Sequence, residues 1–520
     1  MAPNNIVSDG QKSYMHLVDT SRPWYKNRRI VVLNLWIMLL SVTSMANGYD
    51  DGLQLLKQWE LDFNNPSGSK LGLLGAIQNI GGLAAFPFSP YMADILGRKR
   101  TVFFGSVVMV LATIVQTASQ NVNMFIGARF MLGFGLGFAA NTAPMLIMEI
   151  AYPTQRGPIS SVYNALWPGG ALLASWVTFG SFHMNSSWAW RMPSAFQALP
   201  SVFQVFLILW GPESPRWLVA RGREKEALEV LGYYHGNGNQ DDPLVQFEFE
   251  EIRTAIHEEQ IQARTSWFDL FRTPGNRKRM RIVLAIAVFS QWSDLNKVFD
   301  TIGITDPVEQ LLINAFLNLW SLILAVGGGL LCDRLGRRTL FITSTAGMLV
   351  FFLLQTVCSS QYALHGNKAA GNAVVAFIYL YSAAYAIAYS PLITSYTIEV
   401  LPFSLRAKGF TLFGFFVTAS LVFNQYVNPI ALQKLGWKYY IVYVVWLAFE
   451  LVYVYLFLVE RTLEETAALF DGDTKVAELQ RHAAATVGLS GAESHGSTEK
   501  VDEKKSESVE GPIVRELEKA

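Results

Sequence analysis

The sequence predicts an all-α membrane protein with twelve transmembrane helices in two pseudo-symmetric six-helix bundles, and three observations predict this fold. Hydrophobic residues make up 51% of the 520 residues, and they fall into blocks of about 20 with few charges, which matches the thickness of a hydrocarbon core. Water is absent there, so each block must be helical to satisfy its own backbone. Basic residues gather between alternate blocks, and several motifs occur twice, about 240 to 250 residues apart.

Twelve hydrophobic blocks follow one another along the chain. We predict spans at 30–51, 71–92, 101–119, 123–147, 158–181, 190–211, 282–302, 308–331, 338–358, 371–398, 408–430 and 438–459. An N-terminus on the inside puts about 33 of the 41 basic residues in cytoplasmic segments and about six outside. We therefore expect a multi-pass membrane protein, located in the plasma membrane, with both termini cytoplasmic.

The polar segments divide the chain. We expect a cytoplasmic N-terminal segment at 1–28, a six-helix bundle at 29–211, cytoplasmic linker helices at 212–281, a second bundle at 282–460 and a mostly disordered cytoplasmic tail at 461–520. Within the linker, Asp241-Asp242-Pro243 is a helix-start signal, and the next apolar residues have amphipathic spacing: Val245, Phe249, Ile252 and Ile256. After Phe470 the chain has no Phe, Tyr or Trp, which is typical of disorder.

Composition and residue spacing argue against several classes of protein. The formal net charge is zero, so the sequence indicates no nucleic-acid partner. The two cysteines, Cys332 and Cys358, lie at predicted helix ends on opposite sides of the membrane, which argues against a disulfide framework and a metal site. We find no nucleophile–base arrangement and no phosphate-binding loop, so we expect neither an enzyme nor a bound cofactor.

Two short loops carry the same motif at equivalent places in the two halves. Asp94-Ile-Leu-Gly97-Arg98-Lys99-Arg100 follows the second predicted span, and Asp333-Arg-Leu-Gly336-Arg337-Arg338 follows the eighth. Glycine permits a tight chain reversal, and the charged residues can bridge neighbouring helix ends. The alternative is that each basic loop only obeys the positive-inside rule.

A longer ordered set of motifs carries a family resemblance. The set is Gly48-Tyr49-Asp50, Asp94–Arg100, Arg129-x-x-x-Gly133-x-Gly135-x-Gly137, Glu149 to Arg156-Gly157, Pro212-Glu213-Ser214-Pro215-Arg216-Trp217, Asp333–Arg338 and Glu399 to Arg406. From residue 24 to 470 the chain resembles the sugar porter family of the major facilitator superfamily. Within it, Asn424–Leu432 and Arg461–Leu469 resemble fungal hexose transporters and lactose permeases. The resemblance implies the major facilitator fold, a monomer in the lipid bilayer, and transport of a small-molecule sugar by alternating access.

In that family, charged residues of the cytoplasmic motifs form an ion-pair lattice that holds the outward-facing state. The resemblance assigns this gate, by position, to Asp94, Arg98, Glu149, Arg156, Glu213, Arg216, Asp333, Arg337, Glu399 and Arg406. These side chains are then expected to act as structural switches and not as ligands of the solute.

Asp50 lies in the outer half of the first predicted span, where an ionised carboxylate is costly. Arg129 lies at a matching depth in the fourth span. An Asp facing an Arg at low dielectric constant is either charged and paired, or protonated and released. The resemblance implies that this pair carries a coupling proton, because the matching pair does so in proton-coupled sugar porters. The alternative is a fixed ion pair that anchors two helices. Asp51, the next residue, is either an ionised neighbour at the surface or shares the role of Asp50.

A sugar requires amides and hydroxyls for its hydroxyl groups and an aromatic face for its C–H side. The side chains expected to face the cavity are Gln78, Asn79, Asn164, Trp167, Gln291, Trp292, Asn314, Asn318, Thr394, Tyr396 and Asn424. The resemblance implies sugar contacts for Asn164, Gln291 and Thr394 in particular. The alternative for each is an interhelical hydrogen bond or, for the tryptophans, a place at the membrane interface.

The chain departs from the family pattern in two places. In the seventh span, Gln291-Trp292-Ser293 runs directly into Asp294-Leu295-Asn296-Lys297, as though about seven residues, or about 10 Å of helix, were missing. Val459-Glu460-Arg461-Thr462 lacks about three residues. A mispredicted intron or a splice form explains both gaps, and so does a paralogue that has lost transport. An in-frame coding segment in the genomic DNA at codons 293–295 distinguishes the two.

The sequence therefore predicts uptake of a monosaccharide or disaccharide by alternating access, with a proton as the coupling ion. Two alternatives remain open. One is a facilitative sugar carrier without proton coupling. The other is a non-transporting sugar sensor or an inactive variant, although sensors usually carry long tails with repeated motifs, which the residues after Phe470 do not contain.

Overall fold

The computed structural model describes residues 23–49, 57–63, 66, 69–261, 267–292, 306–401 and 405–458, and every regular element within them is a helix. The N-terminal half comprises η1 (Trp24–Lys26), α2 (Arg28–Gly48), α3 (Lys57–Asp62), α4 (Ser69–Ala85), α5 (Ser89–Leu96), α6 (Arg98–Thr117), α7 (Val122–Ile150), η3 (Pro153–Gln155), α8 (Arg156–Ala165), α9 (Trp167–Phe182), α10 (Trp188–Phe196), α11 (Leu199–Leu207) and η4 (Ile208–Trp210).

The C-terminal half follows a group of short helices. The short helices are α12 (Pro215–Ala220), α13 (Glu224–Tyr234), α14 (Pro243–Ile261) and α15 (Asp269–Arg272). The C-terminal half comprises α16 (Pro274–Trp292), α17 (Pro307–Leu335), α18 (Arg337–His365), α19 (Lys368–Val400), α20 (Arg406–Leu435), η7 (Gly436–Lys438) and α21 (Tyr439–Phe457).

Eight stretches of the described residues are long and apolar enough to cross a membrane, and a ninth is added when α4 and α5, bent by 48°, count as one span. One of the eight, Lys408–Phe457, contains both α20 and α21. The predicted spans outside this set are α8–α9, which breaks at Leu166, and α16, which begins with several basic residues. Each of the twelve predicted spans thus coincides, where the structure describes it, with one helix or with two or three consecutive helices. The all-α membrane fold is confirmed.

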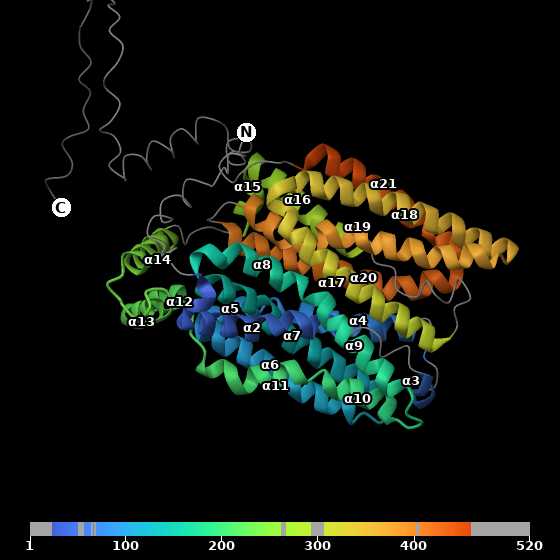
Figure 1. Cartoon of the computed structure of the whole chain (residues 1–520), viewed down its shortest axis with the longest axis horizontal. Coiled ribbons are helices and arrows are strands. Elements are labelled where there is room, and N and C mark those ends of the chain that lie inside the picture. Colours follow the sequence, from blue (N-terminus) through green and yellow to red (C-terminus); the bar gives the residue numbers. More distant parts are fainter. Residues whose placement is uncertain are drawn as a thin grey trace, which may run out of the picture. The chain divides into compact units, whose positions relative to one another are not determined.

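The two halves are built alike and lie side by side (Figure 1). In the N-terminal half α7 packs against α4 and α6, and in the C-terminal half α19 packs against α17 and α18. These are the fourth, second and third spans of one half and the tenth, eighth and ninth of the whole chain. Between the halves, α4 packs against α20 and α9 packs against α17. Exchanging the halves converts one of these contacts into the other, as a pseudo-two-fold axis requires.

Glycines of α7 set its distance from two neighbouring helices. A Cβ atom built on Gly133 would come 1.8 Å from the carbonyl oxygen of Gln78 in α4. One built on Gly135 would come 2.7 Å from the carbonyl oxygen of Gly105 in α6. Small residues let membrane helices approach this closely, and their spacing in the glycine-rich motif therefore reflects packing against two different helices.

The repeated D-x-x-G-R-[KR] motif produces the same backbone in both halves. Gly97 joins α5 to α6 with φ 98°, and Gly336 joins α17 to α18 with φ 81°. Side chains other than that of glycine are strained in this region. The tight reversal predicted from the motif is therefore present at both positions.

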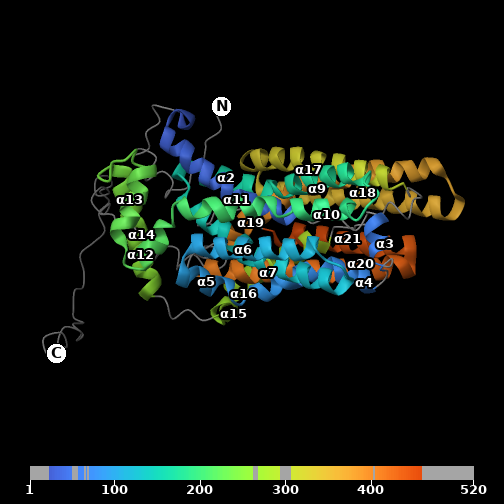
Figure 2. The ribbon, with the colours of Figure 1, turned by 90° about the horizontal axis from the view of Figure 1, so that it is seen from below.

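The helices α12, α13 and α14 lie together at one end of the bundle, hereafter the linker end (Figure 2). As the sequence predicts, α14 begins at Pro243, where the Asp242 carboxylate accepts a hydrogen bond from the Leu244 N–H at 2.9 Å. The predicted apolar face is buried against α12 and α13 in a cluster that contains Trp217, Val219, Leu231, Val245, Phe249 and Ile256, with Ile252 packed against it. Burial of this face gives the linker its own small hydrophobic core.

Candidate functional site

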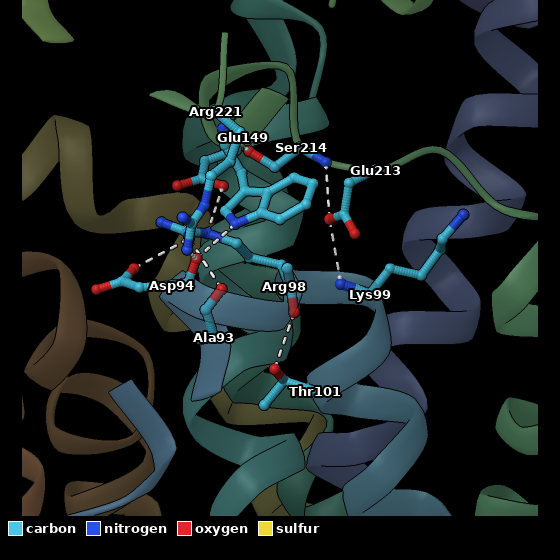
Figure 3. Close-up of polar contacts among 11 residues, drawn as sticks. Ala93, Asp94, Arg98, Lys99, Thr101, Glu149, Glu213, Ser214 and Arg221 are labelled. Carbon is cyan, nitrogen blue, oxygen red and sulfur yellow. Dashed lines mark hydrogen bonds and ion pairs between the residues drawn. The ribbon is translucent and has the colours of Figure 1, made fainter. Parts of the chain in front are cut away.

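Arg98, the first residue of α6, is buried at the linker end of the N-terminal half. Its guanidinium lies 3.1 Å from the Asp94 carboxylate of α5 and 3.3 Å from the Glu149 carboxylate of α7. It also donates to the carbonyl oxygen of Ala93 at 3.1 Å, and Figure 3 shows these acceptors around it. The contact with Asp94 is a charge-assisted hydrogen bond, which is a strong kind, and the ion pair with Glu149 links the α5–α6 elbow to the end of α7.

Glu213 precedes α12 and reaches the N-terminus of α6 (Figure 3). Its Oε1 atom accepts hydrogen bonds from the backbone N–H of Lys99 at 3.2 Å and of Ser214 at 3.0 Å. A carboxylate is favoured at a helix N-terminus by the helix dipole. Burial nevertheless raises the pKa of Glu213 above its ordinary value of 4.5, while the two backbone bonds and the charges of Lys99 and Arg98 oppose that rise.

The carbonyl oxygen of Asp94 fixes α12 to α5. It accepts hydrogen bonds from the indole Nε1 of Trp217 at 2.8 Å and from Nη2 of Arg221 at 2.7 Å. The last turn of a helix has carbonyl oxygens without helical partners. Asp94 is in the last turn of α5, so the linker supplies the donors that this helix end lacks.

Arg156 begins α8, and its partner lies in the linker. Its Nη2 atom is 2.9 Å from Oε1 of Glu248 in α14, and the other Glu248 oxygen is 2.6 Å from Nδ1 of His235. The family resemblance assigned Arg156 to the gate, but neither Glu248 nor His235 was among its predicted partners. Of the other predicted gate residues, Arg216 and Arg337 are half-buried. The side chains of Asp333, Glu399 and Arg406 lie outside the described part of the structure.

Arg129 of α7 is enclosed, with 2% of its surface exposed. Its guanidinium carbon lies over the Phe125 ring, 5.8 Å from the ring centroid, a favourable arrangement for a cation. Phe125 lies about one turn further from the linker end. Asp50, its predicted partner, falls outside the described residues, directly after Tyr49 at the end of α2.

Phe125 belongs to an aromatic cap formed by Trp59, Phe63, Phe125 and Trp190, whose neighbouring ring centroids are 5.2 to 6.0 Å apart. One hydrogen bond ties the cap together, from Trp190 Nε1 of α10 to the Asp62 carboxylate of α3 at 2.7 Å. Sequence reasoning missed α3 and this cap. The signal was present, because Trp59, Asp62 and Phe63 are three and four residues apart and so share a helix face.

Two of the predicted sugar ligands join the halves. Asn79 of α4 donates a hydrogen bond to the Gln425 side chain of α20 at 2.7 Å, and Asn318 of α17 donates to Ser175 of α9 at 3.2 Å. These are the two contacts that the pseudo-symmetry relates. The backbones are close there, because a Cβ atom built on Gly72 would come 2.7 Å from the Tyr426 carbonyl oxygen. Hydrogen bonds between polar side chains of otherwise apolar helices stabilise close helix–helix contacts of this kind.

Asn424 supports the end of α16 from inside the C-terminal half. Its side chain donates to the Gln291 carbonyl oxygen at 2.7 Å and accepts from the Tyr443 hydroxyl at 2.9 Å. Asn428 bridges Asn424 to the tyrosines, with Tyr439 at 3.0 Å and Tyr443 at 2.7 Å from its Oδ1 atom. Gln291 is in the last turn of α16, where carbonyl oxygens need outside donors. In this structure Asn424 therefore makes interhelical hydrogen bonds, and its contact with a sugar stays a prediction.

The remaining predicted ligands differ in exposure. Gln78 is buried against α7, and Tyr396 is buried in the core of the C-terminal half with its ring 5.6 Å from that of Phe341. Both side chains are enclosed in this structure, and their contact with a sugar stays a prediction. The half-buried ones are Gln291, Asn314 and Thr394, and Trp167 is 37% exposed. The structure does not describe the side chains of Asn164 and Trp292. Residues 293–305, which include the seventh-span gap, and residues 459–520 also lie outside the described part.

Sequence reasoning missed three polar residues that make the contacts above. Gln425 lies next to a predicted ligand in an apolar block and was not considered. Glu248 and His235, in the linker, were not considered either. The signal for Glu248 is its place beside Phe249, on the apolar face of α14, where a charge requires a partner.

Comparison with known proteins agrees with this architecture. The model of the sugar (and other) transporter family matches residues 30–470. MFS-type transporter oryC of Aspergillus oryzae is 30% identical over 446 residues, which cover 79% of this chain and 80% of that protein. The low-affinity glucose transporter HXT3 of Saccharomyces cerevisiae is 26% identical over 427 residues, covering 77% and 73%.

Among solved structures, the proton:xylose symporter XylE of E. coli, bound to 6-bromo-6-deoxy-D-glucose, is similar in fold. Its TM-score is 0.69 at 22% identity, over 84% of this chain and 99% of that chain. The relatives and the structural neighbour are transporters and not enzymes. The family match, the all-helical architecture and the two related bundles agree, and this chain therefore belongs to the sugar transporter family of the major facilitator superfamily.

Proposed function

We propose that this protein carries a monosaccharide or disaccharide together with a proton into the cell by alternating access. It acts as a monomer in the plasma membrane, with the proton as its coupling ion, and the linker end is the cytoplasmic side. The family supports the sugar, and the distribution of basic residues supports the orientation. HXT3 is described as a glucose transporter and XylE as a proton:xylose symporter, which supports a sugar substrate and makes coupling a reasonable proposal.

The observation that carries the coupling is the enclosure of Arg129. A guanidinium with 2% exposure, within a helix that can span a membrane, loses several kcal/mol of hydration and requires compensating negative charge. Asp50 follows the last turn of α2, and α2 packs against α7. In this proposal a proton on Asp50 releases Arg129, so the protonation state selects the conformation. An inside-negative potential then drives uptake with about 2.3 kcal/mol per charge per 100 mV.

The gate of the proposed cycle is the set of contacts at the linker end. Arg98 holds α5, α6 and α7 together through Asp94 and Glu149, so in this proposal these three helices move together. Asn79 and Asn318 make hydrogen bonds between the two halves. Rocking of the halves requires these interhelical bonds to break and re-form.

The test is uptake of labelled glucose, xylose, lactose and cellobiose in cells that lack their own sugar transporters, with the external pH recorded. The wild-type protein should accumulate one of these sugars against a gradient while the medium becomes alkaline. Asp50→Asn should lose accumulation but keep exchange of labelled for unlabelled sugar, because exchange needs no net proton movement. Glu309→Gln, at an exposed carboxylate at the start of α17, is the matched control and should behave like the wild type.

Unchanged accumulation by Asp50→Asn refutes proton coupling and leaves the facilitative carrier. Absence of uptake for all four sugars, with the protein present at the cell surface, refutes transport of these sugars. In that case the seventh-span gap is the first feature to repair, by insertion of about seven residues after Trp292.

A further inference from the structure

A groove of about 420 Å³ lies between α2 and α11 of the N-terminal half. Pockets that hold small molecules have this size. Its walls are apolar side chains of the two helices, among them Val32, Trp36, Leu39, Val42, Phe203 and Leu207. The side chains of Leu35, Met38 and Phe203 also border the groove, and each is more than half exposed. The groove therefore opens toward the lipid and not toward the interior of the bundle.

Hydrogen bonds on the buried side of the groove fix the position of its walls. Gln204 of α11 donates to the carbonyl oxygen of Leu39 at 3.1 Å and to the hydroxyl of Thr43 at 2.7 Å. The side-chain oxygen of Gln204 accepts a hydrogen bond from Ser106 of α6 at 2.9 Å. Breaking these bonds is costly, because an unpaired polar group in a membrane has no water to bind. The protein itself thus holds α11 against α2 and keeps the shape of the groove.

The length of the groove matches one leaflet of a bilayer. Val32 and Val42 lie ten residues apart on α2, which is about 15 Å along a helix and half of the hydrocarbon thickness of about 30 Å. The first turn of α2 is at the linker end, where Arg29 donates to the carbonyl oxygen of Tyr233 in α13 at 3.3 Å. The groove therefore runs from near the linker end to about the middle of the membrane, as an acyl chain of one leaflet does.

Arg28 stands at the linker end of the groove. Residues 28, 32, 35, 39 and 42 follow one another at spacings of four and three, which places them along one face of α2. Arg28 is exposed and has no hydrogen bond or ion pair with another residue that the structure describes, whereas the Arg29 guanidinium lies over the Tyr233 ring. Neither α2 nor α11 contains Asp or Glu. Arg28 and the dipole of α2 therefore favour an anionic group at this end of the groove.

We propose that this groove binds one anionic glycerophospholipid. An acyl chain lies along Val32, Leu39 and Val42, and Arg28 holds the phosphate, to which a guanidinium donates two parallel hydrogen bonds. Basic groups at the cytoplasmic ends of membrane helices attract the anionic lipids of that leaflet. The inference rests on the proposed function only for placing the linker end on the cytoplasmic side. A sterol fits the charge pattern less well, because it has no anionic group for Arg28.

The first test measures the contact with the headgroup. Binding of dioleoyl phosphatidylserine and of dioleoyl phosphatidylcholine to the full-length protein in detergent is followed by native mass spectrometry. The wild type should bind phosphatidylserine more tightly. Arg28→Gln should weaken that binding roughly tenfold, because a charge-assisted bond is lost, and should leave phosphatidylcholine binding unchanged. Arg277→Gln, at an exposed arginine near the start of α16, is the control and should bind both lipids like the wild type.

The second test locates the acyl chain. Phosphatidylserine with a photoactivatable group on its acyl chain is added to the full-length protein, and the labelled peptides are identified. Label should concentrate on α2 and α11 in the wild type. Val42→Trp fills the groove and should lower this label several-fold, and Val42→Phe is a smaller change of the same kind in case the first variant does not fold. Leu353→Trp, at an exposed leucine of α18, is the control and should keep the wild-type labelling.

Three outcomes overturn the inference. Equal affinity of the wild type for the two lipids, or an equal loss in Arg28→Gln and Arg277→Gln, excludes a specific contact with the headgroup. Label spread evenly over the membrane helices of the wild type excludes a site for the acyl chain. Labelling of α2 and α11 by a photoactivatable sterol, without labelling by phosphatidylserine, assigns the groove to a sterol. None of these measurements depends on transport, so the proposed function can stand when the inference fails.

Discussion

Gly97→Ala is the most direct test of the loop that both halves share. Gly97 has φ 98° and ψ 160°, a region that only glycine occupies readily. Forcing another residue there costs about 1–3 kcal/mol. Alanine therefore either strains the backbone or moves the elbow between α5 and α6, which carries Arg98.

The neighbouring carboxylate of Glu213 adds a second contribution to the loss of stability. A Cβ atom added to Gly97 would lie 2.6 Å from Oε2 of Glu213, so the Glu213 side chain must shift. That shift weakens or breaks the hydrogen bond between Glu213 and the Lys99 N–H, and a hydrogen bond to a charged group contributes about 1.5–3 kcal/mol to stability. The two terms together predict a loss of about 3 kcal/mol or more.

Thermal unfolding of the purified protein in detergent measures this loss. We expect the Gly97→Ala midpoint to fall by roughly 5 °C. Gly180→Ala is the matched control, because Gly180 lies inside helix α9 and its Cβ would meet nothing within 4 Å. The control should equal the wild type or exceed it slightly, since alanine favours a helix. Equal midpoints for both variants would show that the backbone and the Glu213 contact contribute nothing.

Three further predictions follow from single contacts. Trp190→Phe removes the donor to Asp62, which should cost about 1–3 kcal/mol and speed proteolysis near α3. Asn424→Ala leaves the Gln291 carbonyl and the Tyr443 hydroxyl without this partner, so its thermal midpoint should fall further than that of Trp190→Phe. Burial raises the pKa of Glu213, so the folded protein binds the proton of this carboxyl group more tightly than the unfolded chain does. The stability that this proton contributes is full below pH 4.5 and is lost as the pH rises through the raised pKa. Over that pH range, Glu213→Gln should therefore become more stable relative to the wild type.

Each of these predictions has an outcome that contradicts it. An unchanged cleavage rate in Trp190→Phe would mean that α3 does not depend on its bond to Asp62. A midpoint for Asn424→Ala equal to that of the wild type would remove the proposed support of α16. A difference between Glu213→Gln and the wild type that stays constant with pH would contradict the effect of burial.

The sequence by itself determined the membrane-spanning helices of this protein and several of their ends. A block of about 20 apolar residues has one stable form in hydrocarbon, because only a helix satisfies its own backbone. Positions with special chemistry could also be predicted. Gly97 and Gly336 have the expected reversal, and Pro243 begins the expected linker helix. These features depend only on residues that are near each other in the chain, so the sequence alone is enough to predict them.

Only the tertiary structure decided which polar side chains meet. A membrane helix is apolar toward lipid and toward other helices, so its sequence does not say which face is turned inward. Successive residues of a helix point about 100° apart. Asn424 therefore bonds within its own half while its neighbour Gln425 bonds to Asn79 in the other. That rotation is set by packing against distant segments, and the same cause placed Arg156 on the linker.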